Sequence, residues 1–328
     1  MAQMRFVFLA VAILMVVWPM IATDYVMVLT NRFLIFCLIV LSFSILAGQL
    51  GLVSLVQTTF AGIAGYSVAI LGVSYGITFP WAPLIGLGIV FFTSIVFGLI
   101  TLRTYRIAFI MITLALGQMV WALSFQWSGL TRGMDGISGI PAPTVFGLNF
   151  AQTRDLYVVA ALIVLVAFYA AWILIHSRYG LLLRGIEENE ERMKAFGHPV
   201  LTARLATFVL CALLAALGGI LMAYQSRVIS PATVDIGRAI WVLVAAVVGG
   251  YRYLGGVPLG VLLMVILEAV LNQYTDRHLI VFGTILVLAI LLMPNGLAAW
   301  IESAWVRARP VLQRAARHPG RMFRGGAK

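Results

Sequence analysis

Long apolar runs alternate with short polar breaks along most of the chain. A helix that spans a lipid bilayer needs about 20 mostly apolar residues, whereas the strands of a membrane barrel are about ten residues long and alternate in polarity. The pattern therefore predicts an all-α fold, a polytopic helical membrane protein with about ten transmembrane helices. The predicted spans are Phe6–Ile21, Phe33–Ala47, Leu55–Leu71, Ala82–Leu102, Ile107–Phe125, Leu156–Ile175, Thr202–Tyr224, Ile240–Gly250, Val257–Gln273 and Leu279–Ala298.

Two of these spans differ from the others. Leu55–Leu71 is rich in Gly, Ser, Thr and Gln, and Ile240–Gly250 is short. Small residues also recur at a spacing of four on several spans, which lets helix backbones approach closely in lipid, so we expect close helix crossings there. These positions are Ala61, Gly65 and Ala69; Ser94 and Gly98; Ala215, Gly219 and Ala223; and Ala245 and Gly249.

The composition excludes several classes of protein. Apolar residues make up 62% of the 328 residues and charged residues only 10%, too few to cover a water-soluble surface. The net charge of +11 lies in loops and a tail rather than on one face with interleaved aromatic residues, which argues against nucleic-acid binding. Cys37 and Cys211 lie inside apolar runs and the four histidines lack metal-ligand spacing, so we expect no disulfide and no metal site.

Basic residues give the expected orientation, because Lys and Arg collect in short loops on the cytoplasmic side. With Arg5 inside, ten spans place both the N-terminus and the C-terminus in the cytoplasm, together with most of the basic residues. The exceptions, on the outer side, are Arg32, Arg132, Arg154, Arg227, Arg238 and Arg277.

The spans are expected to form a single transmembrane domain, residues 1–300. It has a cytoplasmic loop at 177–201 and an outer loop at 128–155, and a basic cytoplasmic tail follows at 301–328. The tail is expected to mark topology and to attract anionic lipid headgroups, by about 1 kcal/mol per charge.

The 177–201 loop is the longest polar segment on the predicted inner side and is dense in charge. Residues Gly185 to Phe196 are mostly good helix formers, and Gly197 followed by His198-Pro199 is a stop signal. The pattern predicts a short polar helix that lies under the membrane. It is either a solvated loop or a docking surface for a cytoplasmic partner.

An ordered set of short motifs extends over roughly residues 35 to 300. Its members are the Gly-rich run Gly48 to Tyr66, the outer-loop run Thr131 to Pro143, the run Gly180 to Gly197, Ala206-Thr-Phe, Ala215-Ala-Leu-Gly-Gly219, Ser230-Pro231, Val248-Gly-Gly250 and Met293-Pro-Asn-Gly-Leu297. Each piece is weak alone. Together the ordered set resembles the branched-chain amino-acid permeases of ABC importers, LivM type.

This resemblance implies a transmembrane permease subunit of an ATP-binding-cassette importer, for branched-chain or related amino acids, in a bacterial cytoplasmic (inner) membrane. The implied partners are a sister permease of LivH type, two cytoplasmic ATPase subunits, an extracytoplasmic solute-binding protein and membrane lipid. Gly185 to Gly197 would then be the coupling helix, seated in a cleft of the ATPase. The implied coupling residues are Gly185, Glu187, Glu188, Glu190, Glu191 and Gly197.

The chain itself lacks the loop that cradles ATP phosphates, which needs Gly-Lys followed by Ser or Thr. Its only lysines, Lys194 and Lys328, neither follow Gly nor precede Ser or Thr. We therefore expect no catalytic residue and no cofactor here, with ATP and Mg²⁺ bound by partner ATPase subunits.

Three departures from the family pattern leave the solute open. Ser54-Leu-Val-Gln57 stands where the family usually has a His, Gly249-Gly-Tyr-Arg252 replaces a Gly-Gly-x-Gly run, and Arg132 replaces a common Gly. These differences concern solute identity more than architecture. A branched-chain amino acid, urea, a short amide and an aromatic acid remain open as solutes, as do a homodimer and a heterodimer of permeases.

Glu268 is the one acid inside a predicted span, where a charge costs about 2.5–3.5 kcal/mol on insertion scales. It could pair with an Arg or a backbone donor, line the solute path and attract an ammonium group, or carry a proton. Gln57 and Gln118 could line the path or hydrogen-bond between helices. The solute-path candidates are thus Gln57, Gln118 and Glu268. The alternative function is an ion-coupled secondary transporter that acts without an ATPase.

Overall fold

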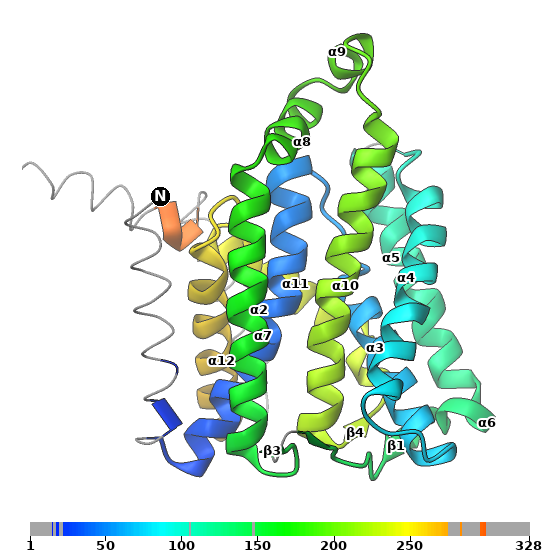
Figure 1. Ribbon diagram of the computed structural model, residues 1–328, viewed down its shortest axis with the longest axis vertical. Coiled ribbons are helices and arrows are strands. Elements are labelled where there is room, and N and C mark those ends of the chain that lie inside the picture. The colour runs from blue at the N-terminus through cyan, green and yellow to red at the C-terminus, as the bar shows by residue number, and fades with distance from the viewer. Residues whose placement is uncertain are drawn as a thin grey trace, which may run out of the picture.

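The computed structural model is a bundle of long helices that run along its longest axis (Figure 1). It describes residues 22–104, 106–145 and 148–274, with isolated residues Met15, Trp18, Pro19, Gly283 and 296–299. Lipid offers no hydrogen bonds, so helices that satisfy their own backbone are the expected elements. The helices are α2 (Asp24–Leu50), α3 (Gln57–Ser74), α4 (Trp81–Thr101), α5 (Arg106–Gln126), α6 (Ser128–Thr131), α7 (Thr153–His176), α8 (Arg178–Glu188), α9 (Glu190–Ala195), α10 (Val200–Ser226), α11 (Ile236–Gly249) and α12 (Gly256–Tyr274), with the short 3₁₀ turns η1 (Gly133–Asp135) and η2 (Pro231–Thr233).

Six helical stretches in the described part are long and apolar enough to cross a membrane. The chain is therefore a polytopic helical membrane protein. The predicted spans Phe6–Ile21 and Leu279–Ala298 fall almost wholly outside the described residues, so the count of ten helices and the side of each terminus stay predictions. The six stretches are Asp24–Leu50, Trp81–Thr101, Ile107–Gln126, Thr153–His176, Val200–Ser226 and Pro231–Gly249.

Each of the other eight predicted spans corresponds to a helix, including the two unusual ones. Leu55–Leu71 corresponds to α3, whose residues 57–69 are buried except for Ile63, so its small polar residues face protein rather than lipid. Ile240–Gly250 corresponds to α11, which begins four residues earlier than predicted. The Asp235 side chain caps that start by accepting a hydrogen bond from the Gly237 N–H (3.1 Å).

The chain re-enters the bundle between α2 and α3. Gly51 ends α2 at φ 64°, and residues 52–56, most of them buried, then run into the protein without helical structure. α3 begins at Gln57, whose Oε1 accepts a hydrogen bond from Ser42 Oγ of α2 (3.3 Å). Ser42 lies eight residues, about 12 Å, before the end of α2. Non-helical backbone is tolerated at such a depth only where protein surrounds it.

α10 packs closely against α3 through small residues. A methyl group built on Gly219 would collide with the backbone of Ala61, and one built on Gly65 would lie 3.3 Å from the Gly219 carbonyl oxygen. All three residues belong to the predicted series at a spacing of four. The expected close crossing is confirmed for this pair of helices.

Two short antiparallel pairings add strand to the predicted all-α fold, at the end of the bundle opposite α8 and α9 (Figure 1). β1 (Ile137–Ser138) pairs with β4 (Val228–Ile229), and β2 (Thr144–Val145) pairs with β3 (Leu148–Asn149). The first pairing joins the α5–α7 connection to the end of α10. Backbone hydrogen bonds therefore hold part of the 128–155 loop against the bundle.

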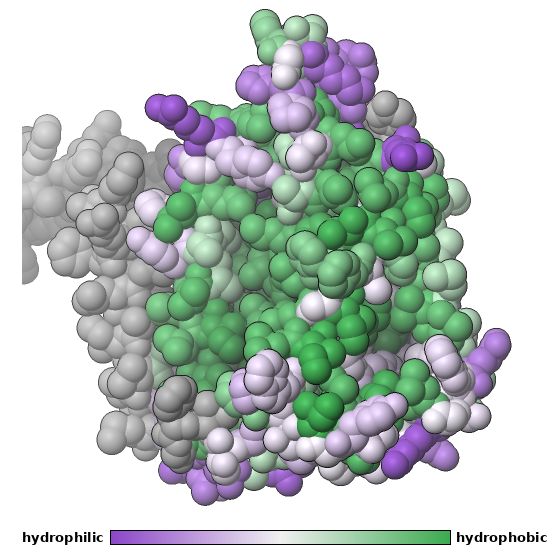
Figure 2. All heavy atoms as spheres, turned by 45° about the vertical axis from the view of Figure 1, so that its right-hand side comes forward, coloured by the Kyte–Doolittle hydropathy of each residue, from purple (hydrophilic) through white to green (hydrophobic). Residues whose placement is uncertain are grey.

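A wide apolar band separates two polar ends of the molecule (Figure 2). Large apolar side chains are exposed along α4, α5 and α7, for example Phe92, Ile107 and Leu162. Contiguous exposed apolar surface of this extent is unfavourable in water and suited to lipid. The surface therefore agrees with the membrane location that the sequence predicts.

We expect Gly219→Ala to destabilise the bundle, because the added methyl group has no space between α10 and α3. Overpacking costs about 1–3 kcal/mol, so thermal unfolding of the purified protein in detergent should move to lower temperature. Gly88→Ala is the matched control, since Gly88 is also a helix residue but has no atom within 4 Å of the added methyl group. Equal unfolding midpoints for the two variants would contradict the crossing.

Candidate functional site

The predicted inner loop folds into two short helices that extend beyond the end of the bundle (Figure 1). α8 begins at Arg178, where the Ser177 hydroxyl accepts a hydrogen bond from the Gly180 N–H (3.3 Å). Gly180, Leu183 and Ile186 lie on one face of α8 and are buried, and the helix packs against α2 and α7. α8 is thus an amphipathic helix fixed to the bundle by its apolar face.

The prediction of one helix from Gly185 to Phe196 is wrong, because the structure breaks it at Asn189. Asn189 has an extended backbone (φ −156°, ψ 98°), and its side chain accepts a hydrogen bond from the Arg192 N–H (2.9 Å). Asn side chains compete with the helical backbone in this way and favour helix starts over helix interiors. The result is α8, one extended residue and α9, here called together with Phe196 the α8–α9 segment (Arg178–Phe196).

The two glycines that the sequence singled out shape this segment. A methyl group built on Gly185 would lie 3.0 Å from Met193 Sδ, so the glycine gives the α9 side chain room to pack on α8. Gly197 has φ 79°, a conformation that L side chains rarely adopt. The predicted stop at Gly197 is confirmed, since α9 ends at Ala195.

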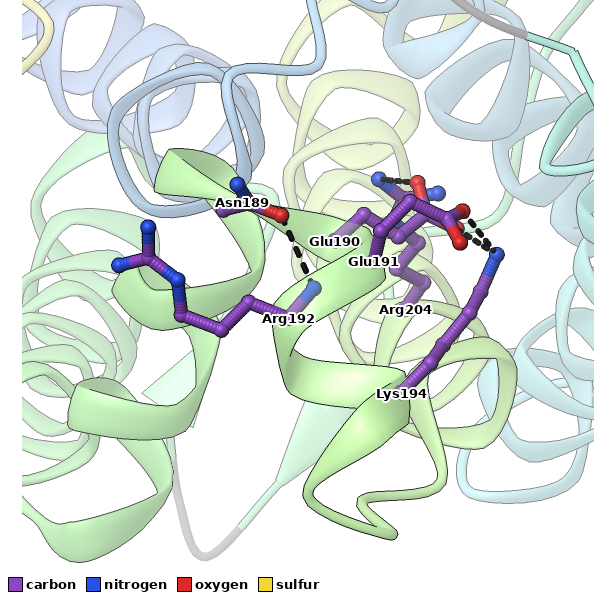
Figure 3. A network of polar contacts seen from close by, with 6 residues as sticks. All are labelled: Asn189, Glu190, Glu191, Arg192, Lys194 and Arg204. Carbon is purple, nitrogen blue, oxygen red and sulfur yellow. Dashed lines mark hydrogen bonds and ion pairs between the residues drawn. The ribbon is translucent and has the colours of Figure 1, made fainter.

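Glu190 ties α9 to α10 (Figure 3). Its Oε2 lies 2.7 Å from Nη2 of Arg204, and its Oε1 lies 3.0 Å from Nζ of Lys194. The Arg204 and Glu190 side chains are shielded, with exposed fractions of 10% and 16%. Hydrogen bonds to Glu190 and Glu191 raise the pKa of Lys194, because they stabilise its charged form. α9 is therefore held on α10 by a shielded ion pair.

Side chains of α8 make two further ties to the bundle. Oε1 of Glu187 lies 3.0 Å from Nη2 of Arg252, in the connection between α11 and α12. Nε of Arg184 donates a hydrogen bond to Oε1 of Gln49 at the end of α2 (3.0 Å). The α8–α9 segment is thus joined by polar contacts to α2, α10 and the α11–α12 connection.

The four predicted coupling glutamates therefore divide into two pairs. Glu187 and Glu190 are largely shielded and pair with Arg252 and Arg204, which lie outside the segment. Glu188 and Glu191 are exposed, with Glu191 exposed by 81%. The sequence could not tell the shielded glutamates from the exposed ones, because the arginines that pair with Glu187 and Glu190 lie in other elements of the fold.

Phe196 is a surface residue of this segment that sequence reasoning missed. It directly follows α9 and is 71% exposed, beside the charged side chains of the segment. The usable signal was a lone aromatic residue inside a charged loop, immediately before the stop glycine Gly197. Exposed aromatic side chains among charged ones are frequent anchors of protein interfaces.

Glu268 lies on α12 beside two arginines. Its Oε1 is 2.7 Å from Nη2 of Arg32 on α2 and 3.8 Å from Nη1 of Arg238 on α11. Both guanidinium groups also approach the ring of Phe36, at 6.0 Å and 5.7 Å from its centroid. Of the three alternatives for Glu268, pairing with arginine is the one seen in these contacts.

The sequence placed Arg32 and Arg238 between spans, and the structure corrects this. α2 begins at Asp24 and α11 at Ile236, so both arginines lie inside helices. Glu268 and an aromatic ring offset part of the cost of a charge there. The sequence did hold a signal for this pairing. Each arginine lies within two residues of a predicted span, and Glu268 is an acid without a sequence neighbour to pair with inside a third span.

The structure does not bring the three solute-path candidates together. Gln57 is buried at the start of α3, against Ser42 of α2. Glu268 contacts Arg32 of α2, ten residues and about 15 Å along the helix from Ser42. Gln118 is half-buried on α5. Gln57 and Glu268 therefore lie at different depths, and a role in one path stays a proposal.

Residues 25–290 match the family described as Branched-chain amino acid transport system / permease component. The match includes nearly every described helix. The chain belongs to this permease family. The resemblance to LivM-type permeases is thereby confirmed, and the family is one of membrane transport subunits rather than enzymes.

Named relatives of the permease agree with this assignment. The chain is 26% identical over 313 residues to the high-affinity branched-chain amino acid transport system permease protein LivM of Escherichia coli (strain K12), covering 88% of this chain and 73% of that protein. It is 25% identical over 258 residues to the probable branched-chain amino acid transport permease protein LivH of Methanocaldococcus jannaschii, covering 72% and 81%. No solved structure matches the chain.

In this permease, Glu190→Ala should loosen α9, because Arg204 then keeps a shielded charge without its carboxylate. A hydrogen bond to a charged group contributes about 1.5–3 kcal/mol, so amide hydrogen exchange across residues 190–195 should rise by about 10- to 100-fold. Glu191→Ala is the matched control, since it removes only an exposed contact with Lys194. Equal exchange in both variants would show that the Arg204 pair does not hold α9.

Proposed function

We propose that this permease forms half of the membrane path of an ATP-driven importer for branched-chain or related amino acids. The observation that carries the proposal is the family match over residues 25–290. The names of the relatives support the solute class, since they describe branched-chain amino acid transport. A single permease domain over residues 1–300, followed by a basic tail at 301–328, is part of the proposal.

The orientation is proposed from the charges at the two ends of the bundle. Basic residues are more numerous at the α8–α9 end, and such residues favour the cytoplasmic side. We therefore place the α8–α9 segment in the cytoplasm of a bacterium, with the permease in the inner membrane. Ten spans would then bring both termini to the same side. The described basic residues nearer the α8–α9 end are Arg103, Arg106, Arg178, Arg184, Arg192, Lys194, Arg204 and Arg252, against Arg32, Arg132, Arg154, Arg227 and Arg238 nearer the other.

The proposed partners follow from the permease assignment. A sister permease of LivH type would complete the path, an extracytoplasmic binding protein would deliver the solute, and two cytoplasmic ATPase subunits would bind ATP and Mg²⁺. The LivH relative supports the sister, because one family covers both kinds of chain. No cofactor is proposed for this chain.

The α8–α9 segment is proposed as the surface that docks in the ATPase. Phe196, Glu188 and Glu191 are exposed and would contact the ATPase, with Phe196 as the apolar anchor. Glu187 and Glu190 would transmit motion through their ion pairs with the bundle. Closure of the ATPase pair around ATP would then displace α10. This displacement would switch the side of the membrane to which the solute path is open.

The comparisons favour this reading over an ion-coupled transporter. The matched family is a permease component of a transport system. Glu268, the residue that such a carrier would use, is hydrogen-bonded to Arg32 at 2.7 Å. No observation in the described part of the chain independently favours ion coupling.

The test is uptake of labelled L-leucine by vesicles that contain the permease, its sister chain, the ATPase subunits and the binding protein. Uptake should require ATP on the α8–α9 side. Phe196→Ala should weaken binding of the ATPase by about 30-fold, the effect of losing an anchor that contributes about 2 kcal/mol, and should reduce uptake in parallel.

Phe92→Ala is the matched control, because Phe92 has the same side chain and a similar exposed fraction, 69%, but lies on α4 outside the segment. It should bind the ATPase as the wild type does. Leucine uptake by this chain alone, driven by an ion gradient and indifferent to ATP, would contradict the proposed function.

A further inference from the structure

A group of charged and aromatic side chains from α2, α11 and α12 has more charged and polar groups than a structural ion pair needs. Its members, here called the Arg–Glu cluster, are Arg32, Phe36, Arg238, Trp241 and Glu268. The Phe36 and Trp241 rings lie 4.5 Å apart between centroids, and the two arginines approach the same Phe36 ring. Arg238 and Trp241 are three residues apart on α11, which places them on one face of that helix.

Two polar atoms of the cluster lack a hydrogen-bond partner in the described part of the chain. Glu268 Oε2 and Trp241 Nε1 are both buried and have no hydrogen-bond partner among the residues that the structure describes. The Trp241 side chain belongs to the core, while Glu268 keeps an exposed fraction of 20%. Buried polar atoms of native proteins are nearly always paired, so these two unpaired atoms need an explanation.

The cluster also has a surplus of positive charge. Two arginines face one glutamate, so the three side chains carry a formal charge of +1. Arg32 is hydrogen-bonded to Glu268 at 2.7 Å, but Arg238 stays 3.8 Å away, beyond hydrogen-bond distance. The donors of the Arg238 guanidinium are therefore not used by Glu268. A guanidinium with free donors is well matched to a carboxylate, which it can bind with two parallel hydrogen bonds.

These two sets of free groups are complementary to the two charged ends of an α-amino acid. We propose that the Arg–Glu cluster binds the zwitterionic head of the solute, with Arg238 and Trp241 Nε1 on its carboxylate and Glu268 Oε2 on its ammonium group. Arg32 would hold Glu268 in place through its hydrogen bond. The inference rests on the proposed function and names the residues that would recognise its solute class.

The charges of the cluster argue for a zwitterion over a simple ion. A cation alone would meet a net positive charge, and an anion alone would meet the unpaired Glu268 oxygen. The Arg32 and Arg238 side chains are partly exposed, by 31% and 36%, so the cluster opens to the surface of the chain. It lies toward the end opposite the α8–α9 segment: Arg32 is eight residues, about 12 Å, from the start of α2. Solute would enter an importer from that end.

The experiment is equilibrium binding of labelled L-leucine to the assembled permease and ATPase complex in nanodiscs that contain phosphatidylcholine alone. Two competitors keep one charged end each: 4-methylpentanoate has only the carboxylate, and 3-methylbutylamine has only the ammonium group. In the wild type, each should bind at least about tenfold more weakly than leucine, because a charge-assisted contact is lost. Equal binding of leucine and either competitor would overturn the zwitterion site.

Variants of the cluster test which residues bind the carboxylate of the solute and which bind its ammonium group. Trp241→Phe keeps the aromatic contact and removes the N–H, and Arg238→Lys keeps the charge and removes the planar fork. Each should weaken leucine binding by about fivefold or more. Glu268→Gln should bring leucine and 4-methylpentanoate to nearly equal affinity. Arg154→Lys is the matched control, since Arg154 forms an exposed pair with Asp24 near the same end, and should bind leucine as the wild type does.

The outcomes separate the inference from the proposed function. One outcome is ATP-dependent leucine uptake in vesicles together with leucine binding that is unchanged in all three cluster variants. It would overturn the cluster as a binding site but would leave the proposed importer function intact. Loss of co-purified phosphatidylethanolamine in the variants, with leucine binding unchanged, would reassign the cluster to lipid. Absence of ATP-dependent uptake by the wild type would remove the proposed function itself. Co-purification of the ATPase with each variant confirms assembly. The competition experiment uses only the wild type, so it tests the site even if a variant fails to assemble.

Discussion

The contact between Gly219 and the backbone of Ala61 sets the distance between α10 and α3, which pack against each other more extensively than any other two described helices. α10 also packs against α2 and α4, and α3 against α4, so these four helices share one core. Phe60 of α3 contacts Phe97 of α4 and Phe208 of α10 within it, at centroid distances of 5.8 Å and 5.7 Å. Helices in lipid gain little from burying apolar surface against each other, so close backbone approach of this kind must supply much of the packing energy.

Buried polar groups are energetically costly in such a bundle, and in this molecule they gather in three places. At the α8–α9 end, Glu190 and Arg204 are shielded as a pair, so the charge is tolerated and also fixes the segment to α10. Deeper in the bundle, the interrupted backbone before α3 leaves Ser54, Gln57 and Thr58 with buried atoms unpaired among the described residues. The Arg–Glu cluster lies at another depth, around Arg32, which is ten residues along α2 from Ser42. An apolar protein that retains polar atoms at these costs is more easily explained by transport than by stability.

The sequence predicted elements well and tertiary contacts poorly. The length of the apolar runs located eight helices, because a span in lipid must be long and apolar whatever packs against it. The start of α2 at Asp24 was missed because the partner of Arg32 is Glu268, 236 residues away. The break at Asn189 was missed because helix formers on both sides outweighed one capping residue. For the site, the coupling loop was found from its charge, but which of its glutamates face outward depends on Arg204 and Arg252.

α10 is a single unbroken helix of 27 residues, and the place where it crosses α3 is not at its centre. Arg204 lies 15 residues, about 22 Å, on one side of Gly219, and Ser226 lies seven residues, about 10 Å, on the other. If the helix rocks as a rigid body about that crossing, it is a lever with unequal arms and Gly219 at the fulcrum. A displacement of about 2 Å at Arg204 becomes about 1 Å in the opposite direction at Ser226, delivered with about twice the force. The geometry would thus convert a large, weak movement at one surface into a small, strong one at the strands on the other.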